Sequence, residues 1–372
     1  MSDTESIAAL RPKIWQKELY QDVMDGLYFM KNGMMGTDSN NIIQIKDELT
    51  KEVGDTVTFG LTAKLTGAGV DGDNELEGNE EAISAYSDSV AINQKRFGVR
   101  LKGILDEQTN AYDMRMDAKN KLTIRLQEFI ERQFFLKLGG VRNALLTDVA
   151  GLAVAVDCLW SNSPAVIPQA DEAAGFGARY LCADYAAGTD SLETTDLITP
   201  AIISRARVKA QTASPKLIPL RYEGKNYYVL FIHPYQAFDL KNNQTFAQAQ
   251  REAQVRGDAN PIFTGALGIW DGVIIHECEY VPFLDVSVAG YSFEGDAVGT
   301  QCAVDACRAL LCGAQAGAFA KAKNPNGWVE KTFDYSNKTG FATGLIGGIQ
   351  KVSFNSKEYG VIAIDTAITA LV

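Results

Sequence analysis

The chain has 372 residues, a net charge of −11, and 46% hydrophobic and 22% charged residues, as expected for a globular protein of about two to three domains. This net negative charge argues against a protein that binds nucleic acid mainly by neutralising its phosphates. No apolar run reaches the roughly 18 residues that cross a bilayer. The first ten residues lack the basic and then apolar pattern of a secretion signal, so we expect the protein to remain in the cytosol where it is made.

The first 52 residues read as an N-terminal arm rather than a domain. Apolar residues recur with helical spacing over residues 14–30, and Asn32-Gly33 ends the pattern. We therefore expect a short helix within an arm that precedes the folded body.

Residues 53–103 are predicted to form a long hairpin. Val57, Phe59 and Leu61 alternate with threonines, and a second strand is predicted over residues 83–103. Arms of about 10 to 12 residues would reach about 35 to 40 Å, at roughly 3.3 Å per residue. An isolated two-stranded hairpin is marginal in water, so we expect it to lie on its own chain or on a neighbouring chain.

The segment between the two strands, residues 67–81, is rich in glycine and acid and has no basic residue. Its acids are Asp71, Asp73, Glu75, Glu77, Glu80 and Glu81. Their spacing does not match a calcium loop of the EF-hand type, so we interpret the tip as a solvated loop or an electrostatic contact with another subunit. The natural complement, on this chain or on a copy of it, is the basic set of the return strand: Lys95, Arg96, Arg100 and Lys102.

The strongest helix signal covers residues 106–138, which contain no proline or glycine. An apolar stripe that includes Leu122, Leu126 and Phe134 runs along it. At 1.5 Å per residue the helix would be about 50 Å long. A compact domain does not need that length, so we predict a spine helix within residues 104–140.

The rest of the chain is predicted to be mixed helix and strand, from residue 141 to about 326, followed by terminal strands. The predicted helices are 201–212, 234–256 and an alanine-rich 301–323, and the predicted strands are 227–232, 273–280, 329–335, 348–354 and 361–368. Thr199 is the expected N-cap of the first of these helices, with Pro200 at its first position. Residues 340–348 are glycine-rich but lack the Gly-Lys-Ser/Thr ending of a phosphate loop, so we predict a turn between strands.

Side chains that could carry chemistry are few. His276 and Cys278 share one face of a predicted strand, but a zinc site needs at least one more ligand. Cys302, Cys307 and Cys312 recur every five residues and would not converge on one face of a helix. We interpret all of these as packing residues and the cysteines as reduced thiols. We therefore predict no catalytic, cofactor-binding or metal-binding residue.

The order of arm, hairpin, spine helix, mixed body and terminal strands resembles the α+β fold of tailed-phage major capsid proteins of the Hong Kong ninety-seven type. Local segments resemble the family of the coliphage N-four major capsid protein. These segments are Gly54–Phe59, Gly69–Gly72, Leu76–Gly78, Glu80–Glu81, Phe231–Pro234, Asp239–Lys241, Asn260–Phe263, Gly265–Gly268, Leu310–Ala316 and Gly347–Lys351.

The resemblance implies a role for each part of the chain. Residues 1–52 would be an arm that clasps an adjacent capsomer, and residues 53–103 an extended loop over the neighbouring subunit. Residues 104–140 would be the spine helix of a peripheral domain, residues 141–326 mainly an axial domain, and residues 327–372 strands that return to the peripheral domain. Lys64 lies on the extended loop, where some relatives cross-link subunits, but no asparagine partner is identifiable and we predict no cross-link.

The resemblance implies a structural protein, the major subunit of an icosahedral head that encloses double-stranded DNA without sequence-specific binding. Its partners would be further copies in hexameric and pentameric capsomers, a scaffolding protein, a portal and possible decoration proteins, with assembly in the bacterial cytoplasm and no membrane contact. The alternatives are the shell protein of a bacterial nanocompartment with the same fold and a cytosolic oligomeric enzyme. Particle size separates the shell proteins from the enzyme.

Overall fold

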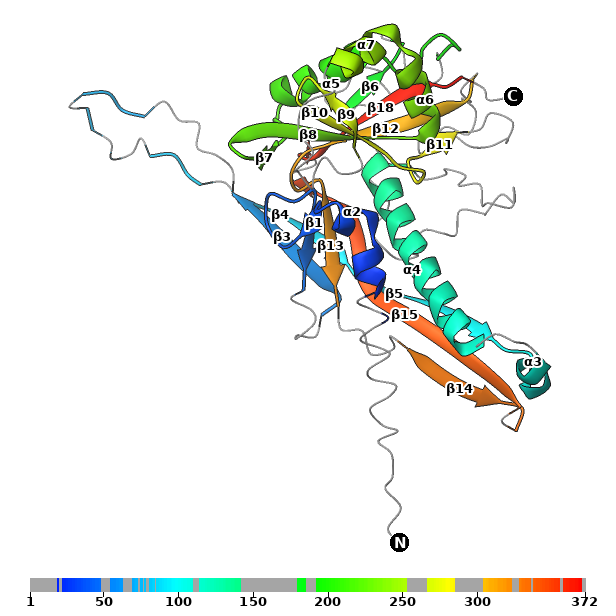
Figure 1. Cartoon of the computed structure of the whole chain (residues 1–372). Coiled ribbons are helices and arrows are strands. Elements are labelled where there is room, and N and C mark those ends of the chain that lie inside the picture. Colours follow the sequence, from blue (N-terminus) through cyan, green and yellow to red (C-terminus); the bar gives the residue numbers. More distant parts are fainter. Residues whose placement is uncertain are drawn as a thin grey trace.

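In the computed structural model an eight-stranded sheet lies at one end of a long helix, and a six-stranded sheet runs along the side of the same helix (Figure 1). The structure describes residues 19, 22–47, 54–62, 69–72, 74, 75, 77, 80–83, 85–109, 114–141, 179–184, 192–252, 266–284, 304–322, 328–335, 337–354 and 357–369. None of the helices among these residues is long and apolar enough to span a membrane.

The larger sheet has eight strands. Six of them run in the order β6 (Tyr180–Cys182), β18 (Val361–Ala367), β12 (Ala306–Cys312), β8 (Lys225–Ile232), β10 (Val273–Glu277) and β9 (Ala266–Trp270), while β7 (Leu220–Tyr222) pairs with β8 and β11 (Phe283–Leu284) with β12. Every residue of β12 and β18 is buried. These two strands therefore form the centre of the core at this end of the molecule.

Three helices lie beside the eight-stranded sheet (Figure 1): α5 (Pro200–Thr212), α6 (Pro234–Asn242) and α7 (Gln244–Glu252). The start of α5 is as predicted, because the Thr199 side chain caps it by accepting a hydrogen bond from the backbone N–H of Ile202. The predicted helix 234–256 is divided at Asn243, whose Oδ1 accepts from the N–H of Thr245 and so begins α7.

The smaller sheet has six strands. Five run in the order β1 (Met35–Gly36), β2 (Ile43–Lys46), β13 (Gly317–Lys321), β15 (Lys338–Lys351) and β14 (Val329–Phe333), and β5 (Asn93–Arg100) pairs with the opposite edge of β15. The spine helix is α4 (Met114–Gly139), and a short α3 (Ile104–Thr109) precedes it. Leu122, Leu126 and Phe134 are buried on α4, as predicted.

Residues 22–47 of the predicted N-terminal arm pack on the body of the same subunit, and residues 1–18, 20, 21 and 48–52 of it lie outside the described residues. Val23, Leu27 and Phe29 are fully buried in the main core, residues 22–26 are helical, and α2 spans Tyr28–Lys31. Strand β2 pairs in parallel with β13 inside the smaller sheet. The apolar face of this N-terminal segment is therefore covered by the body of the same subunit.

The predicted helix 301–323 is also wrong, since this segment forms β12 and β13. A run of small and apolar residues buried on both faces suits a central strand as well as a buried helix, and periodicity alone does not separate the two. Cys307 and Cys312 are buried packing residues on β12, and Cys302 lies outside the described residues.

The glycine-rich residues 340–348 form no turn but lie within the 14-residue strand β15. Gly348 shows the reason, because a Cβ atom there would lie 2.1 Å from the carbonyl oxygen of Ala91. Glycine is required where the end of the hairpin crosses closely over this strand.

The chain crosses between the two sheets more often than the sequence indicated. The terminal strands do not all join the spine helix, because β18 lies in the eight-stranded sheet, and β13, expected with the axial part, lies in the six-stranded sheet. One crossing follows β12 and another follows β15. At the second crossing Lys351 and Glu358 form a buried ion pair of 2.7 Å.

Candidate assembly interface

The base of the long hairpin lies on its own subunit. Strands β3 (Thr56–Thr62) and β4 (Ala85–Ala91) pair antiparallel, with Val57 opposite Val90. Val57, Phe59 and Val90 are buried in a cluster with alanines of β13 and with Phe354. These three apolar side chains therefore anchor the base of the hairpin to its own subunit.

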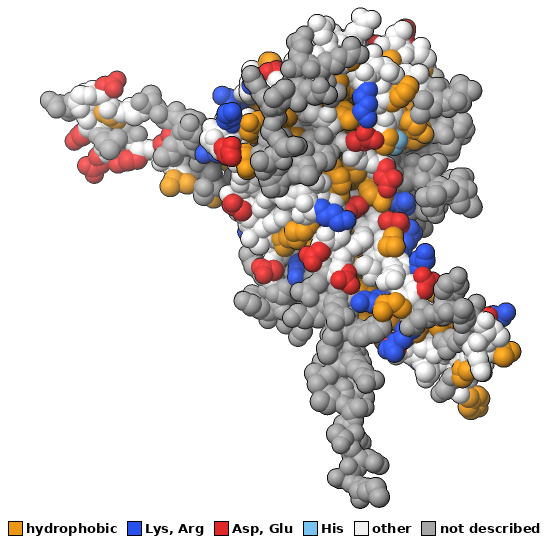
Figure 2. Space-filling view, viewed as in Figure 1, with side chains coloured by type: hydrophobic (Ala, Val, Ile, Leu, Met, Phe, Trp, Pro, Cys, Tyr) orange, Lys and Arg blue, Asp and Glu red, His pale blue; other side chains and the backbone are white. Residues whose placement is uncertain are grey.

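The tip of the hairpin, described here as residues 69–83 with gaps, projects away from both sheets (Figure 1). Gly69 and Gly72 have positive φ, and the Asn74 side chain donates to the Asp71 carbonyl at 2.7 Å, so the tip is shaped by local turns. Its described acids are all exposed, namely Asp71, Glu75, Glu77, Glu80 and Glu81. Figure 2 shows these acidic side chains gathered at the far end of the projection. Asp73 and Lys64 lie outside the described residues.

The basic residues predicted as a complement do not lie on the hairpin. The predicted return strand 83–103 is two strands, β4 in the hairpin and β5 in the six-stranded sheet. Lys95 Nζ lies 5.4 Å from the centre of the Phe129 ring, and the Arg100 guanidinium lies 4.5 Å from that of Phe333. Arg96 and Lys102 are exposed.

Among the described residues, no ion pair joins these four cations to the tip acids of the same chain. The tip and the cations lie on separate parts of one subunit (Figure 1). Any pairing between them therefore needs a second copy of the chain.

His276 on β10 and Cys278 directly after it, the two side chains that could have bound a metal ion, both lie in the core. His276 is fully buried, and its Nδ1 lies 3.1 Å from the hydroxyl oxygen of Tyr28 on the N-terminal segment. Burial raises the pKa of the Cys278 thiol to about 12 and also raises the pKa of Tyr28. Within the described part of the chain, no three His, Cys, Asp or Glu side chains gather closely enough to hold a metal ion.

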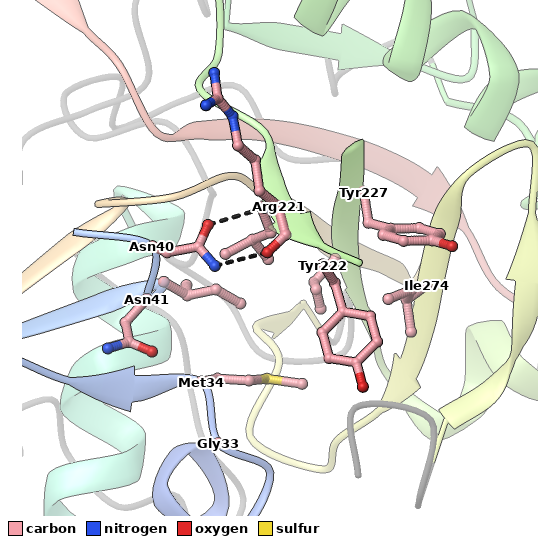
Figure 3. A pocket seen from close by; sticks show the side chains of 11 residues that line it. Gly33, Met34, Asn40, Asn41, Arg221, Tyr222, Tyr227 and Ile274 are labelled. Carbon is pink, nitrogen blue, oxygen red and sulfur yellow. Dashed lines mark hydrogen bonds between the residues drawn. The ribbon is translucent and has the colours of Figure 1, made fainter. Parts of the chain in front are cut away.

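A cavity of about 70 Å³ lies where the N-terminal segment meets the eight-stranded sheet (Figure 3). The Asn40 side chain binds the backbone of Arg221 twice, donating to its carbonyl and accepting from its N–H, each at 2.8 Å. The lining residues are Gly33, Met34, Asn40, Asn41, Ile42, Leu220, Arg221, Tyr222, Tyr227, Val229 and Ile274. Among the described residues that line the cavity there is no carboxylate, imidazole or thiol.

The described residues form a body of two large sheets and a long helix, from which an acidic hairpin projects (Figures 1 and 2). The family described as phage capsid protein matches residues 4–370, and the chain belongs to that family. The major capsid protein of Pseudomonas phage KPP25 is 31% identical, over 95% of this chain and 94% of the relative.

Solved phage capsids have the same fold. The capsid of Ralstonia phage GP4 superposes with a TM-score of 0.75 at 30% identity, covering 92% of each chain. The capsid of cyanophage Pam1 gives a TM-score of 0.69 at 25% identity, covering 90% of this chain and 91% of the other. The head of Helicobacter pylori bacteriophage KHP40 shares the fold at 15% identity, with a TM-score of 0.64 and coverage of 92% and 91%.

Proposed function

We propose that this chain is the major capsid subunit that self-assembles, as hexameric and pentameric capsomers, into the icosahedral head of a tailed bacteriophage enclosing double-stranded DNA. The observation that carries the proposal is the near full-length similarity to the major capsid protein of Pseudomonas phage KPP25. The close fold match to the capsid of Ralstonia phage GP4 supports it. The net charge of −11 fits the role, because an acidic shell limits adsorption of the packaged DNA to its wall.

The finer classification is the Hong Kong ninety-seven type of fold and the family of the coliphage N-four capsid protein. The order of extended hairpin, spine helix and two sheets supports it, together with segments such as Leu310–Ala316 and Gly347–Lys351. On this proposal the six-stranded sheet with α4 is the peripheral domain, and the eight-stranded sheet is the axial domain.

The acidic tip is proposed to contact the basic strand of a neighbouring subunit. The acids are Asp71, Asp73, Glu75, Glu77, Glu80 and Glu81, and the cations are Lys95, Arg96, Arg100 and Lys102. The exposure of the described acids and their separation from the cations of the same chain support a contact between copies. Lys64, which the sequence analysis assigns to the same hairpin, belongs to the proposed interface.

Assembly is proposed to take place in the host cytoplasm with a separate scaffolding protein and a portal, and the finished protein resides in the virion. A decoration protein is a further possible partner. These partners follow from the proposed role of the chain.

Negative-stain electron microscopy of the purified protein, alone and co-expressed with the neighbouring genes, tests the proposal. We expect capsomers or closed shells of uniform diameter. A discrete small oligomer that forms no shell under either condition would contradict it.

A further inference from the structure

A short two-stranded ribbon lies where the chain crosses from the six-stranded to the eight-stranded sheet. Its strands are β16 (Ser353–Phe354) and β17 (Lys357–Glu358), which pair antiparallel and lie in the chain between β15 and β18. Among the described residues, the hairpin strands β3 and β4 pair only with each other and not with a strand of the eight-stranded sheet. Any link between the hairpin and that sheet therefore has to pass through other elements, and the ribbon contacts both.

One side of the ribbon is attached to the base of the hairpin. The Ser353 N–H donates a hydrogen bond to Asp88 Oδ2, on β4, at 3.0 Å. Phe354 is buried in the same apolar cluster as Phe59 and Val90. A movement of β4 therefore has to move the ribbon with it or break these contacts.

The other side of the ribbon is attached to the eight-stranded sheet by buried charged groups. Glu358 pairs with Lys351 at 2.7 Å, and the Glu358 carbonyl accepts a hydrogen bond from Arg179 Nε at 2.8 Å. Arg179 is 1% exposed and directly precedes β6, the edge strand of the sheet. Its own carbonyl accepts a hydrogen bond from the N–H of Ala363 on β18 at 3.0 Å. Since removing one partner of a buried ion pair is strongly destabilising, these groups hold the ribbon firmly to the edge of the sheet.

We propose that Asp88, Arg179, Lys351, Ser353 and Glu358 form a clamp that couples the position of the hairpin to the edge of the eight-stranded sheet. We name these five residues the crossing clamp. Ser353 lies opposite Glu358 in the ribbon, so the bond to the hairpin and the bonds to the sheet start from one pair of facing residues. Coupling between two sites is reciprocal, and a change at either end of the clamp therefore acts on the other end.

The coupling is a property of the single subunit. In the proposed capsid it has a consequence that rests on the proposed function, because a contact of the hairpin tip with a neighbouring subunit would be transmitted to the eight-stranded sheet. The test below needs no particle, so its failure would leave the proposed function unaffected.

Hydrogen–deuterium exchange of the unassembled full-length subunit, followed by mass spectrometry with fragment resolution, tests the clamp. Asp88→Ala removes the hairpin end of the clamp at a half-buried position. The amide of Ala363 should then exchange at least about fivefold faster, while the amides of β9 and β10, toward the opposite edge of the same sheet, keep the rate of the wild type. Faster exchange confined to the hairpin and the ribbon would overturn the inference. A uniform increase over the whole chain would also overturn it, because that result reports lower global stability.

The matched control is Asp55→Ala, which removes a carboxylate from the start of the same hairpin. The Asp55 side chain accepts a hydrogen bond from the hydroxyl of the adjacent Thr56 at 3.4 Å, and its loss should leave the exchange of Ala363 unchanged. An equal effect of Asp55→Ala and Asp88→Ala would count against the clamp.

The reciprocal variant is Arg179→Lys. Lysine keeps the charge but cannot make both hydrogen bonds of the guanidinium, to the carbonyls of Glu358 and Pro215. Exchange in β3 and β4 should become faster by the same factor as exchange of Ala363 does in Asp88→Ala, and unchanged exchange there would overturn the inference. If Arg179→Lys gives no folded subunit, the result for Asp88→Ala decides on its own.

Discussion

Arg308 and Asp365 form a fully buried ion pair at the centre of the eight-stranded sheet. Two hydrogen bonds of 2.7 Å join them, the Tyr180 hydroxyl donates to the same carboxylate at 2.9 Å, and Arg308 also donates to the Gly139 carbonyl at the end of α4. The pair therefore fixes the C-terminal end of the spine helix to the sheet. Removing one partner of such a pair leaves the other charge buried and uncompensated.

Asp365→Asn keeps the shape of the side chain but removes its charge, so the free energy of unfolding should fall by about 3–5 kcal/mol. Urea denaturation of the unassembled subunit measures the change. The control is Asp271→Asn, because Asp271 pairs with Arg207 at the surface and exposed pairs contribute about 0–1 kcal/mol. Equal effects of the two substitutions would contradict the structural role given to Arg308 and Asp365.

Strand β15 needs a glycine at the point where strand β4 crosses closely over it. At Gly348 a Cβ atom would meet the backbone of Ala91 and the side chain of Val90. Gly348→Ala should therefore separate the hairpin base from the sheet and destabilise the subunit by about 1–3 kcal/mol. Thermal melting followed by circular dichroism measures the loss.

The matched control is Gly60→Ala in β3, where no heavy atom lies within 4 Å of the added Cβ. This substitution should leave stability unchanged or raise it by about 0.5–1 kcal/mol, since alanine has less backbone freedom to lose than glycine. If Gly348→Ala behaved like the control, the close crossing of β4 over β15 would not be present in solution.

Leu126 is 1% exposed on α4, and Leu126→Asp would bury an unpaired carboxylate at a cost of several kcal/mol. We expect insoluble or unfolded subunit in an expression and solubility assay. Ile124→Asp, at a position on the same helix that is 49% exposed, should give folded protein. Soluble Leu126→Asp protein that melts cooperatively would show that this stripe is not core.

The elements that the sequence predicted well are those with a local signal. The cap at Thr199, the strand predicted over residues 227–232, which lies within β8, and the apolar stripe of α4 each follow from neighbouring residues. The packing of the N-terminal segment could not be predicted, because its apolar face is covered by α4 and β13, which lie far away in the chain. The prediction of a helix where β12 lies was wrong because a segment that is buried on both faces has no diagnostic hydrophobic period.

The sequence predicted which charged residues form the candidate interface, but not how they are arranged in space. The density of acids at the tip is plain in the sequence, and the described acids are exposed. The separation of the cations from the tip was not predictable, because it depends on β5 leaving the hairpin to pair with β15, more than 200 residues later in the chain.

At the scale of the whole molecule, the proposed assembly surface is separate from the parts that stabilise the single subunit. The hairpin base is anchored by Val57, Phe59 and Val90, whereas the described tip acids are exposed. Substitutions at the tip should therefore leave the fold of one subunit intact and act only where two copies meet. Substitutions in the core should act on folding before any assembly takes place.

The tip variant tests this separation. Replacing Asp73, Glu75, Glu77, Glu80 and Glu81 together by Lys should leave the circular dichroism and melting temperature of the unassembled subunit nearly unchanged while abolishing particles. Exposed ion pairs contribute only about 0.2–1 kcal/mol each, but a shell repeats every contact many times, so a small loss at each interface prevents closure. Acidic replacements at Arg96, Arg100 and Lys102 should restore particles, because they return opposite charges to the two surfaces. Normal particles from the five-Lys variant would show that the tip is a solvated loop without a role in assembly.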